Sequence, residues 1–187
     1  MFNSVMKTGN VSATGTIGEA NVTRIRRLGL VVLILILWTS CDQVTKNIAK
    51  ESLASSSPIS LLNDSIRIEY TENAGAILGL GANLPSEARF LFLVVFVSLV
   101  LAITLLVAVN THSFSVIQLV GLSLVAAGGI GNLLDRLFND GAVIDFIRLG
   151  IGPLRTGIFN MADVAIVIGV ATFLLFNTQG KAKAAAN

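Results

Sequence analysis

The order of apolar and polar positions divides the chain into four long apolar runs joined by polar connections. The runs cover roughly residues 28–45, 90–109, 116–134 and 158–176. Each approaches the length of about 20 residues that a helix needs to cross a bilayer core of about 30 Å. Within the connection 51–88, residues 65–71 alternate apolar and polar side chains, the two-residue period of a strand. The pattern predicts an all-α membrane fold: four transmembrane helices with a small extracytoplasmic β-region between helices 1 and 2.

Composition agrees with a membrane protein, because 53% of the residues are hydrophobic and only 13% are charged, whereas soluble domains carry about 25% charge. Residues 1–23 are rich in small polar residues without an apolar period, so we expect a flexible cytoplasmic tail. Residues 24–178 form one four-helix membrane domain, and residues 179–187 form a basic cytoplasmic tail.

The distribution of charge predicts the orientation of the four spans. If the spans alternate in direction, both termini and the connection 110–115 lie on one side. That side holds the bases Lys7, Arg24, Arg26, Arg27, Lys181 and Lys183 and the single acid Glu19. The opposite side holds seven bases and ten acids. Positive charge concentrates on the cytoplasmic flank, so both termini are expected inside.

The segment 24–42 also has the layout of a bacterial lipoprotein signal: a basic start, an apolar run and then Cys41. Three further apolar runs follow, which a lipoprotein does not normally carry, and Trp38 stands where such signals usually have leucine. We therefore interpret the segment as an uncleaved first span. With one cysteine in the chain, no intrachain disulfide forms.

Polar residues gather where the third and fourth runs meet the outer side. The clusters are Gly131–Arg136 and Phe159–Asp163, and Val143–Phe146 between them carries another carboxylate. Ionisable residues are costly in a bilayer and mark function by default. The only histidine, His112, falls on the predicted cytoplasmic turn, which disfavours a Ser/His/Asp triad, a Cys/His dyad or a zinc site. No metal or other cofactor is expected.

With these groups disfavoured, carboxylates are the remaining catalytic candidates. Of two carboxylates that lie close together, one can act as the general acid and the other as the general base in the attack of water on an amide. The candidates near the outer boundary are Asp42, Asp135, Asp145 and Asp163, with Asp64, Glu69, Glu72 and Asp140 in loops. Two other interpretations stay open at this point. Membrane carboxylates also serve as ion relays in transporters, and the polar groups of a non-enzymatic scaffold hold helices together.

Helical spacing groups some of these side chains. Asn132 lies three residues before Asp135 and four before Arg136, so the three share one helix face. Asn160 and Asp163 are likewise neighbours on the fourth run. Asp42 and Lys46 share a face of the first run and are more typical of a strut between helices than of catalysis.

Over roughly residues 28–176 the chain resembles the lipoprotein signal peptidase (signal peptidase II) family, the membrane aspartyl peptidases of bacteria. The similar motifs are Asp42-Gln-Val-Thr-Lys46, Asn73-Ala-Gly-Ala76, Gly128-Gly-Ile-Gly-Asn-Leu-Leu-Asp-Arg136, Val143-Ile-Asp-Phe-Ile147 and Phe159-Asn-Met-Ala-Asp-Val-Ala-Ile166. Each motif alone is weak, but all five occur in order at matching ends of the four runs. The chain departs from many relatives at Ile77, where they carry an aromatic residue.

The resemblance implies that Asp145 and Asp163 are the catalytic pair. It also implies that certain residues bind the substrate, namely Asn73, Asn132, Arg136 and Asn160. Asp42, Lys46 and Asp135 are then structural support. The implied substrate is a prolipoprotein with a diacylglyceryl-modified cysteine, cleaved N-terminal to that cysteine. The implied location is a bacterial inner membrane, with the active site at its outer face. We expect a monomer that contacts membrane lipids and no nucleic acid, and we expect Gly128, Gly129 and Gly131 to make room for the signal helix.

Overall fold

The computed structural model describes residues 14–76, 80–111 and 113–185. The expectations for residues 1–13, Ile77 and His112 lie outside this range. The helices are α1 (Thr14–Leu53), α2 (Ser86–Phe90), the π-helix η2 (Leu91–Phe96), α3 (Val97–Asn110), α4 (Val116–Phe138) and α5 (Met161–Ala185). The strands are β1 (Ile59–Leu61), β2 (Ile66–Asn73), β3 (Val143–Ile151) and β4 (Leu154–Arg155).

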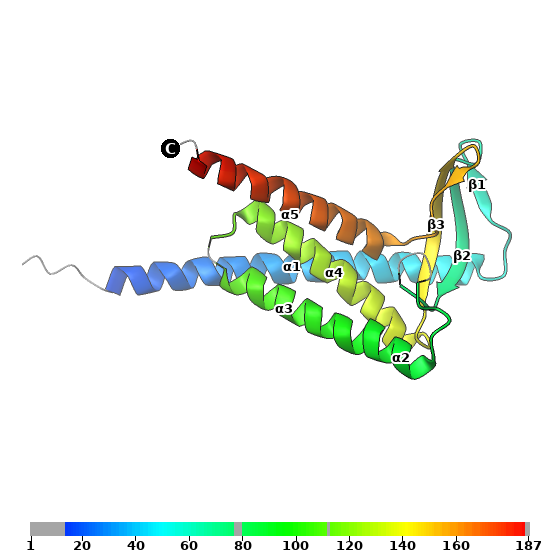
Figure 1. Ribbon diagram of the computed structural model, residues 1–187, viewed down its shortest axis with the longest axis horizontal. Coiled ribbons are helices and arrows are strands. Elements are labelled where there is room, and N and C mark those ends of the chain that lie inside the picture. The colour runs from blue at the N-terminus through cyan, green and yellow to red at the C-terminus, as the bar shows by residue number, and fades with distance from the viewer. Residues whose placement is uncertain (1–13, 77–79, 112, 186–187) are drawn as a thin grey trace, which may run out of the picture.

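Long helices run side by side, and the sheet crosses one end of the bundle (Figure 1). Among the described residues, three helical stretches are long and apolar enough to cross a membrane: Arg24–Leu53, Ser86–Asn110 and Val116–Phe138. Met161–Phe176 is a shorter apolar helix. The protein is thus mostly helical and suited to a membrane, as the sequence predicts.

The first and the last helix are both longer than predicted. The helix α1 begins at Thr14, inside the segment 1–23 that the sequence assigned to a flexible tail, and α5 continues to Ala185, inside the predicted tail 179–187. Extending an existing helix costs little, because each added residue gains a hydrogen bond after the nucleus has formed. Small polar residues can therefore continue a helix that they could not have started.

The sheet is larger than predicted and comes from two loops. Its antiparallel order is β1-β2-β3-β4. The predicted strand 65–71 is confirmed as β2, but β3 and β4 come from residues 138–157, which the sequence left as a loop between the third and fourth runs. Val143, Ile144, Asp145 and Phe146 are buried on both faces of β3, so this strand lacks the alternation by which a half-exposed strand is recognised.

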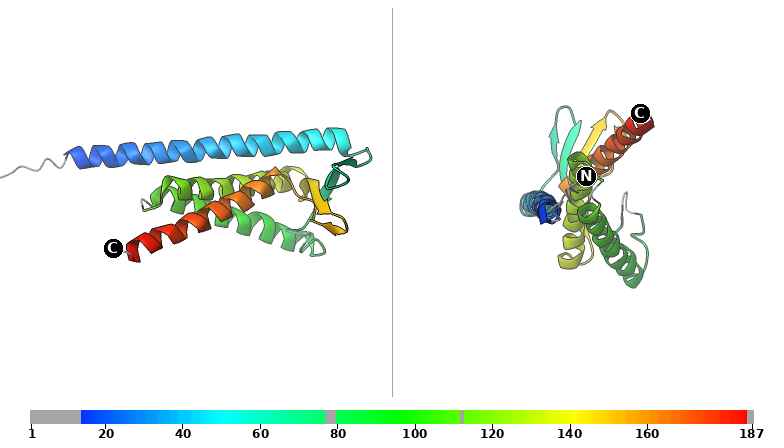
Figure 2. Two further views of the ribbon diagram at one scale, coloured as in Figure 1. Left: turned by 90° about the horizontal axis from the view of Figure 1, so that it is seen from above. Right: turned by 90° about the vertical axis from the view of Figure 1, so that its left-hand side faces the viewer.

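The helix α4 is the centre of the bundle and contacts α1, α3 and α5 (Figure 2). A capping box starts it: the Ser115 Oγ accepts from the Gln118 N–H, and the Gln118 side chain accepts from the Ser115 N–H. Where α4 packs against α5, the two helix backbones approach each other closely. A Cβ on Gly121 would lie 2.8 Å from the Gly169 carbonyl oxygen, the close approach that small residues allow between helices in lipid.

The glycines near the polar end of α4 also serve helix packing. A Cβ on Gly128 would lie 2.3 Å from the Ala162 carbonyl oxygen, and one on Gly131 would lie 2.5 Å from Asp42 Oδ2. A Cβ on Gly129 would clash with the Leu101 side chain of α3. The expectation that these glycines make room for a signal helix is therefore wrong for Gly128 and Gly131, whose space is filled by α5 and α1. Gly129 also lines the cavity described below, so for this residue the expectation stays a prediction.

Candidate active site

The start of α5 fixes the position of Asp163. The Asn160 Oδ1 accepts from the Asp163 N–H at 3.0 Å, while Asp163 Oδ2 accepts from the Asn160 N–H at 3.1 Å. This is the reciprocal pairing of a capping box, with asparagine as the N-cap residue. The other oxygen, Oδ1, accepts from Asn132 Nδ2 of α4 at 3.0 Å. Helix capping and one cross-helix bond therefore hold both carboxylate oxygens of Asp163.

Asp145 comes from β3 and is only 3% exposed. Its Oδ1 accepts from Asn160 Nδ2 at 2.7 Å and its Oδ2 from Asn73 Nδ2 of β2 at 3.2 Å. Asn160 thus contacts both aspartates, through its side-chain amide on Asp145 and its backbone N–H on Asp163. The two carboxylates that the family resemblance implies as the catalytic pair are therefore both hydrogen-bonded to this one residue.

A bulge in β2 makes the Asn73 contact possible. Ile68 pairs with Ile147, but Thr71 pairs with Asp145, so β2 holds one extra residue between these two pairs. Without the bulge, Asn73 would be opposite residue 142 and would point to the face away from Asp145. Because one residue of slip moves a side chain to the other face of a sheet, the bulge turns Asn73 toward the carboxylate.

The environment favours the protonated form of Asp145. Burial raises its pKa most, and the neighbouring charge of Asp163 raises it further, to about 6. Hydrogen bonds from Asn73 and Asn160 and the charge of Lys46 oppose this shift. A carboxyl that holds a proton close to neutral pH beside a second carboxylate is suited to acid–base chemistry.

The predicted supporting residues anchor both elements that carry the aspartates. Asp42 Oδ1 accepts from the Ala162 N–H at 2.8 Å, one residue before Asp163. Asp135 Oδ2 accepts from the Ile144 N–H at 3.0 Å, one residue before Asp145.

Lys46 contacts both Asp42 and Asp135. Its Nζ lies 2.8 Å from Asp42 Oδ2 and 2.9 Å from Asp135 Oδ2, and it donates to Asn132 Oδ1 at 3.0 Å. Lys46 is 1% exposed. Sequence reasoning missed Gln43, which donates to Asp135 Oδ1 at 2.8 Å and to the Gly131 carbonyl oxygen at 3.2 Å. Its position directly after Asp42 was the available signal.

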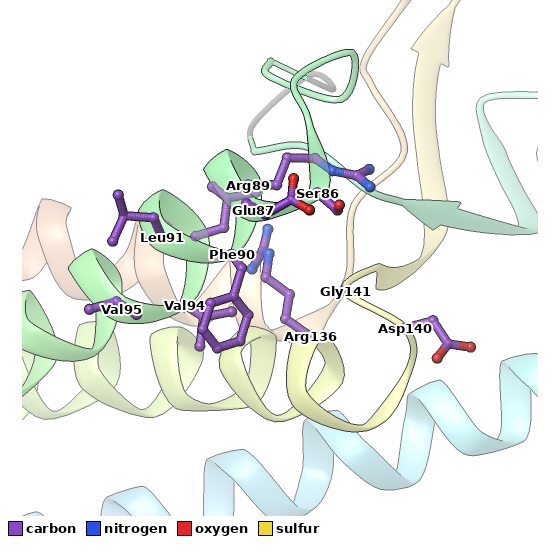
Figure 3. Close-up of a pocket in the computed structure, with 11 residues that line it drawn as sticks. Ser86, Glu87, Arg89, Phe90, Leu91, Val94, Val95, Arg136, Asp140 and Gly141 are labelled. Carbon is purple, nitrogen blue, oxygen red and sulfur yellow. The ribbon is translucent and has the colours of Figure 1, made fainter.

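Arg136 holds the loop that follows β2. It donates to the Gly75 carbonyl oxygen at 2.8 Å and to its own helix at the Asn132 carbonyl oxygen. The side chain stands between two cavities. One, of about 660 Å³, lies between α2, η2 and the end of α4 and is partly lined by Glu87, Phe90 and Arg136 (Figure 3). The other, of about 620 Å³, contains the two aspartates.

The cavity with the aspartates combines a polar end with apolar walls. Its polar lining includes Asn73, Asn132, Arg136, Asp145 and Asp163. Its apolar lining includes Leu93, Val97, Val164, Ile166 and Val167 from η2, α3 and α5. Residues 156–159 complete the wall beside β3. The structure therefore brings both predicted catalytic residues and three of the predicted substrate-binding residues to one cavity, with Asn160 buried behind them; their actions on a substrate stay predictions.

Within the described part of the chain, no group of three histidine, cysteine or acidic residues is placed to hold a metal ion. The arrangement supplies two carboxylates, fixed amide donors and an apolar groove, which suits hydrolysis of a peptide bond in a largely apolar substrate.

Comparison with known proteins identifies the family. The family described as Signal peptidase (SPase) II matches residues 33–178. The lipoprotein signal peptidase of Borrelia hermsii is 32% identical over 169 residues, covering 87% of this chain and 97% of the relative. That of Halothermothrix orenii is 34% identical over 150 residues, covering 80% of this chain and 94% of the relative.

A solved structure has the same fold. It is described as a bacterial membrane enzyme determined by the in meso method at 2.3 Å resolution, and it superposes with a TM-score of 0.73 at 26% sequence identity. The match covers 83% of this chain and 91% of the other. The fold, the family match and the full-length relatives agree: the chain belongs to the signal peptidase II family.

Proposed function

We propose that this protein is an aspartic endopeptidase that removes the signal peptide from diacylglyceryl-modified prolipoproteins, cleaving N-terminal to the lipidated cysteine. Membership of the signal peptidase II family and relatives named lipoprotein signal peptidase support this activity. One observation carries the catalytic assignment: Asp145 and Asp163, from separate elements, line one cavity and are both hydrogen-bonded by Asn160.

In the proposed reaction, the Asp163 carboxylate takes a proton from a water molecule while that water's oxygen attacks the carbonyl carbon of the scissile bond. The Asp145 proton passes to the carbonyl oxygen, which gives a neutral tetrahedral diol. Asp163 then protonates the nitrogen as the carbon–nitrogen bond breaks, and Asp145 recovers its proton from a hydroxyl of the diol. One water is consumed, and the dyad returns to its starting state.

The same proposal places four spans in a bacterial inner membrane, with α5 as the fourth, both termini cytoplasmic and the dyad at the outer face. The charge bias toward the predicted inner side supports this orientation. At that end, Arg27 donates to the carbonyl oxygens of Phe114 and Thr111 in the turn between α3 and α4. A lipid-anchored cysteine would hold its scissile bond at the opposite, outer surface, beside the cavity.

The transporter interpretation gains no support from the family comparison. The network of acids also lies at one end of the bundle, around the cavity that Asp145 and Asp163 line. A proton relay needs ionisable groups across the membrane.

The test replaces Asp145 or Asp163 with asparagine and follows cleavage of a lipidated prolipoprotein in membranes. Each variant should accumulate normally and show no processing. Asp140→Asn is the matched control, because Asp140 is exposed in the same outer region, and its left-handed backbone (φ 50°) accepts asparagine; it should process normally. Normal processing by Asp163→Asn would refute the dyad, and loss of protein accumulation would instead assign that residue a structural role.

A further inference from the structure

The segment Thr156–Phe159 runs between β4 and α5 and lines the catalytic cavity along its whole length. One edge of this segment is occupied by β3. The Phe159 N–H donates to the Ile147 carbonyl oxygen at 2.9 Å, and the Ile147 N–H donates back to the Phe159 carbonyl oxygen at 2.9 Å. Phe159 is therefore paired with β3 as a strand residue would be.

The other edge is open. Consecutive residues of an extended chain direct their backbone groups to opposite sides, so the N–H and C=O of Ile158 face away from β3. Across residues 14–76, 80–111 and 113–185, no hydrogen bond engages the backbone of Gly157 or Ile158. Both residues are only half-buried, and both line the cavity. These backbone groups are thus presented beside the two aspartates without a partner in the fold.

Resting on the function proposed above, we propose that Gly157 and Ile158 form a docking edge for the substrate backbone. The stretch of prolipoprotein next to the scissile bond binds extended, as a strand added to this edge. One substrate residue donates its N–H to the Ile158 carbonyl oxygen and accepts the Ile158 N–H at its own carbonyl. This is recognition by strand addition, in which main-chain bonds give affinity and alternate side chains enter pockets.

Physical chemistry favours this mode over binding of a helix. A helical peptide has its amide groups bonded internally, so the scissile bond must leave the signal helix before water can attack it. Leaving the helix frees backbone groups near hydrocarbon, where each unpaired group costs several kcal/mol. An open edge with a free donor and acceptor supplies the missing partners. Alternate side chains of the added strand would face the apolar wall made by residues such as Leu93, Val97 and Val164.

Adjacency to the catalytic groups makes the edge relevant to cleavage. Asn160, two residues beyond Ile158, donates to Asp145 and caps the helix that carries Asp163. A substrate residue paired with Ile158 therefore lies within a few residues of the bond to be cut. The docking edge leads directly into α5, which carries Asp163, and pairs through Phe159 with β3, which carries Asp145.

An amide-to-ester scan of the substrate tests the proposal. A synthetic lipopeptide with a diacylglyceryl cysteine is prepared with a single ester at each of the four non-scissile linkages before the cysteine, and cleavage by the full-length protein is measured by mass spectrometry. An ester removes one N–H without adding bulk. We expect kcat/KM to fall about threefold to tenfold at one position, the loss of one hydrogen bond. A smaller effect is expected at the next linkage toward the cysteine, because its ester carbonyl is a weaker acceptor for the Ile158 N–H.

Ile158→Pro supplies the matching change on the enzyme. It removes the Ile158 N–H, which bonds to no other described residue, and Ile158→Ala keeps that N–H while shortening the side chain. Proline should lower kcat/KM more than alanine. In the proline variant the ester penalty should shrink at the linkage whose carbonyl accepts the Ile158 N–H, because that hydrogen bond no longer exists. If the proline variant does not fold, the scan in the parent protein decides alone.

The outcomes separate the two proposals. Failure to cleave the all-amide lipopeptide would overturn the proposed function and this inference with it. Cleavage of that lipopeptide with an equal effect of the ester at every position would overturn only the docking edge. An unchanged ester penalty at the linkage whose carbonyl accepts the Ile158 N–H, in a folded Ile158→Pro protein, would also overturn it.

Discussion

Replacing Lys46 with methionine should destabilise the protein strongly, because Lys46 is the only cation in contact with two buried carboxylates among the described residues. Its Nζ lies 2.8 Å from Asp42 and 2.9 Å from Asp135, and the exposures of the three residues are 1%, 0% and 5%. Methionine keeps most of the volume of lysine and removes the charge. The expected loss of stability therefore comes from electrostatics and not from a cavity.

The expected size follows from this geometry. Removing one partner of a buried ion pair costs about 3–5 kcal/mol, because the other charge stays buried without compensation. For a chain of this length, about 1 kcal/mol shifts Tm by about 2–4 °C, so Lys46→Met should lower Tm by about 6–20 °C. Adding Asp135→Asn should recover part of the loss, since it removes one of the two unpaired carboxylates.

Thermal unfolding of the purified protein in detergent measures the effect, with Lys50→Met as the control. Lys50 lies one turn further along α1, is exposed, and donates to Asn139 Oδ1 at 2.8 Å. Surface changes of this kind stay within about 0.5 kcal/mol, or about 2 °C. A Lys46→Met protein that unfolds within about 2 °C of the parent would refute the claim that this lysine neutralises the buried network.

Three further predictions address the dyad and the packing. First, kcat/KM should fall as pH rises through about 6, since the Asp145 pKa is raised to about 6 and the proton it donates is lost above that value; a kcat/KM that is flat from about pH 4.5 to about pH 7.5, about 1.5 units either side of that pKa, would contradict this. Second, Asn160→Ser keeps a helix cap but loses the amide bonds to Asp145, to Asn132 and to the Ile144 carbonyl oxygen, so it should destabilise the protein by about 1–3 kcal/mol. In the folded protein kcat/KM should fall by about 10²-fold and the alkaline limb of the pH profile should move to higher pH; unchanged kinetics would show that Asn160 has only a structural role. Third, Gly128→Ala places a Cβ 2.3 Å from the Ala162 carbonyl oxygen and should cost about 1–3 kcal/mol in thermal unfolding, whereas Gly29→Ala, which meets nothing within 4 Å, should be neutral or slightly stabilising.

The predictability of the fold differed between helices and sheet. Apolar length alone located the long helices, since a membrane span needs about 20 apolar residues whatever its neighbours are. Alternation located β2 but not β3. Residues 143–146 are buried on both faces, and a short continuous apolar run does not distinguish a strand from other buried structure.

The sequence predicted the chemistry of the site better than its hydrogen-bond contacts. Spacing placed Asn160 beside Asp163, and the structure makes the pair a capping box. Spacing could not choose Asp145 over Asp135, because both are single carboxylates next to apolar residues; the family resemblance made that choice. The bulge that turns Asn73 toward Asp145 has no sequence signal of its own, since it depends on how β2 pairs with a strand about 70 residues away.

The central claim is that Asp145 and Asp163 together hydrolyse the bond N-terminal to a lipidated cysteine. The most direct measurement is a single turnover of a diacylglyceryl lipopeptide by the purified full-length protein in H₂¹⁸O, with the products weighed by mass spectrometry. We predict one ¹⁸O in the carboxylate of the released N-terminal fragment, a second product that begins with the lipidated cysteine, and no products from Asp163→Asn. The same products formed by Asp163→Asn at an undiminished rate would contradict the account.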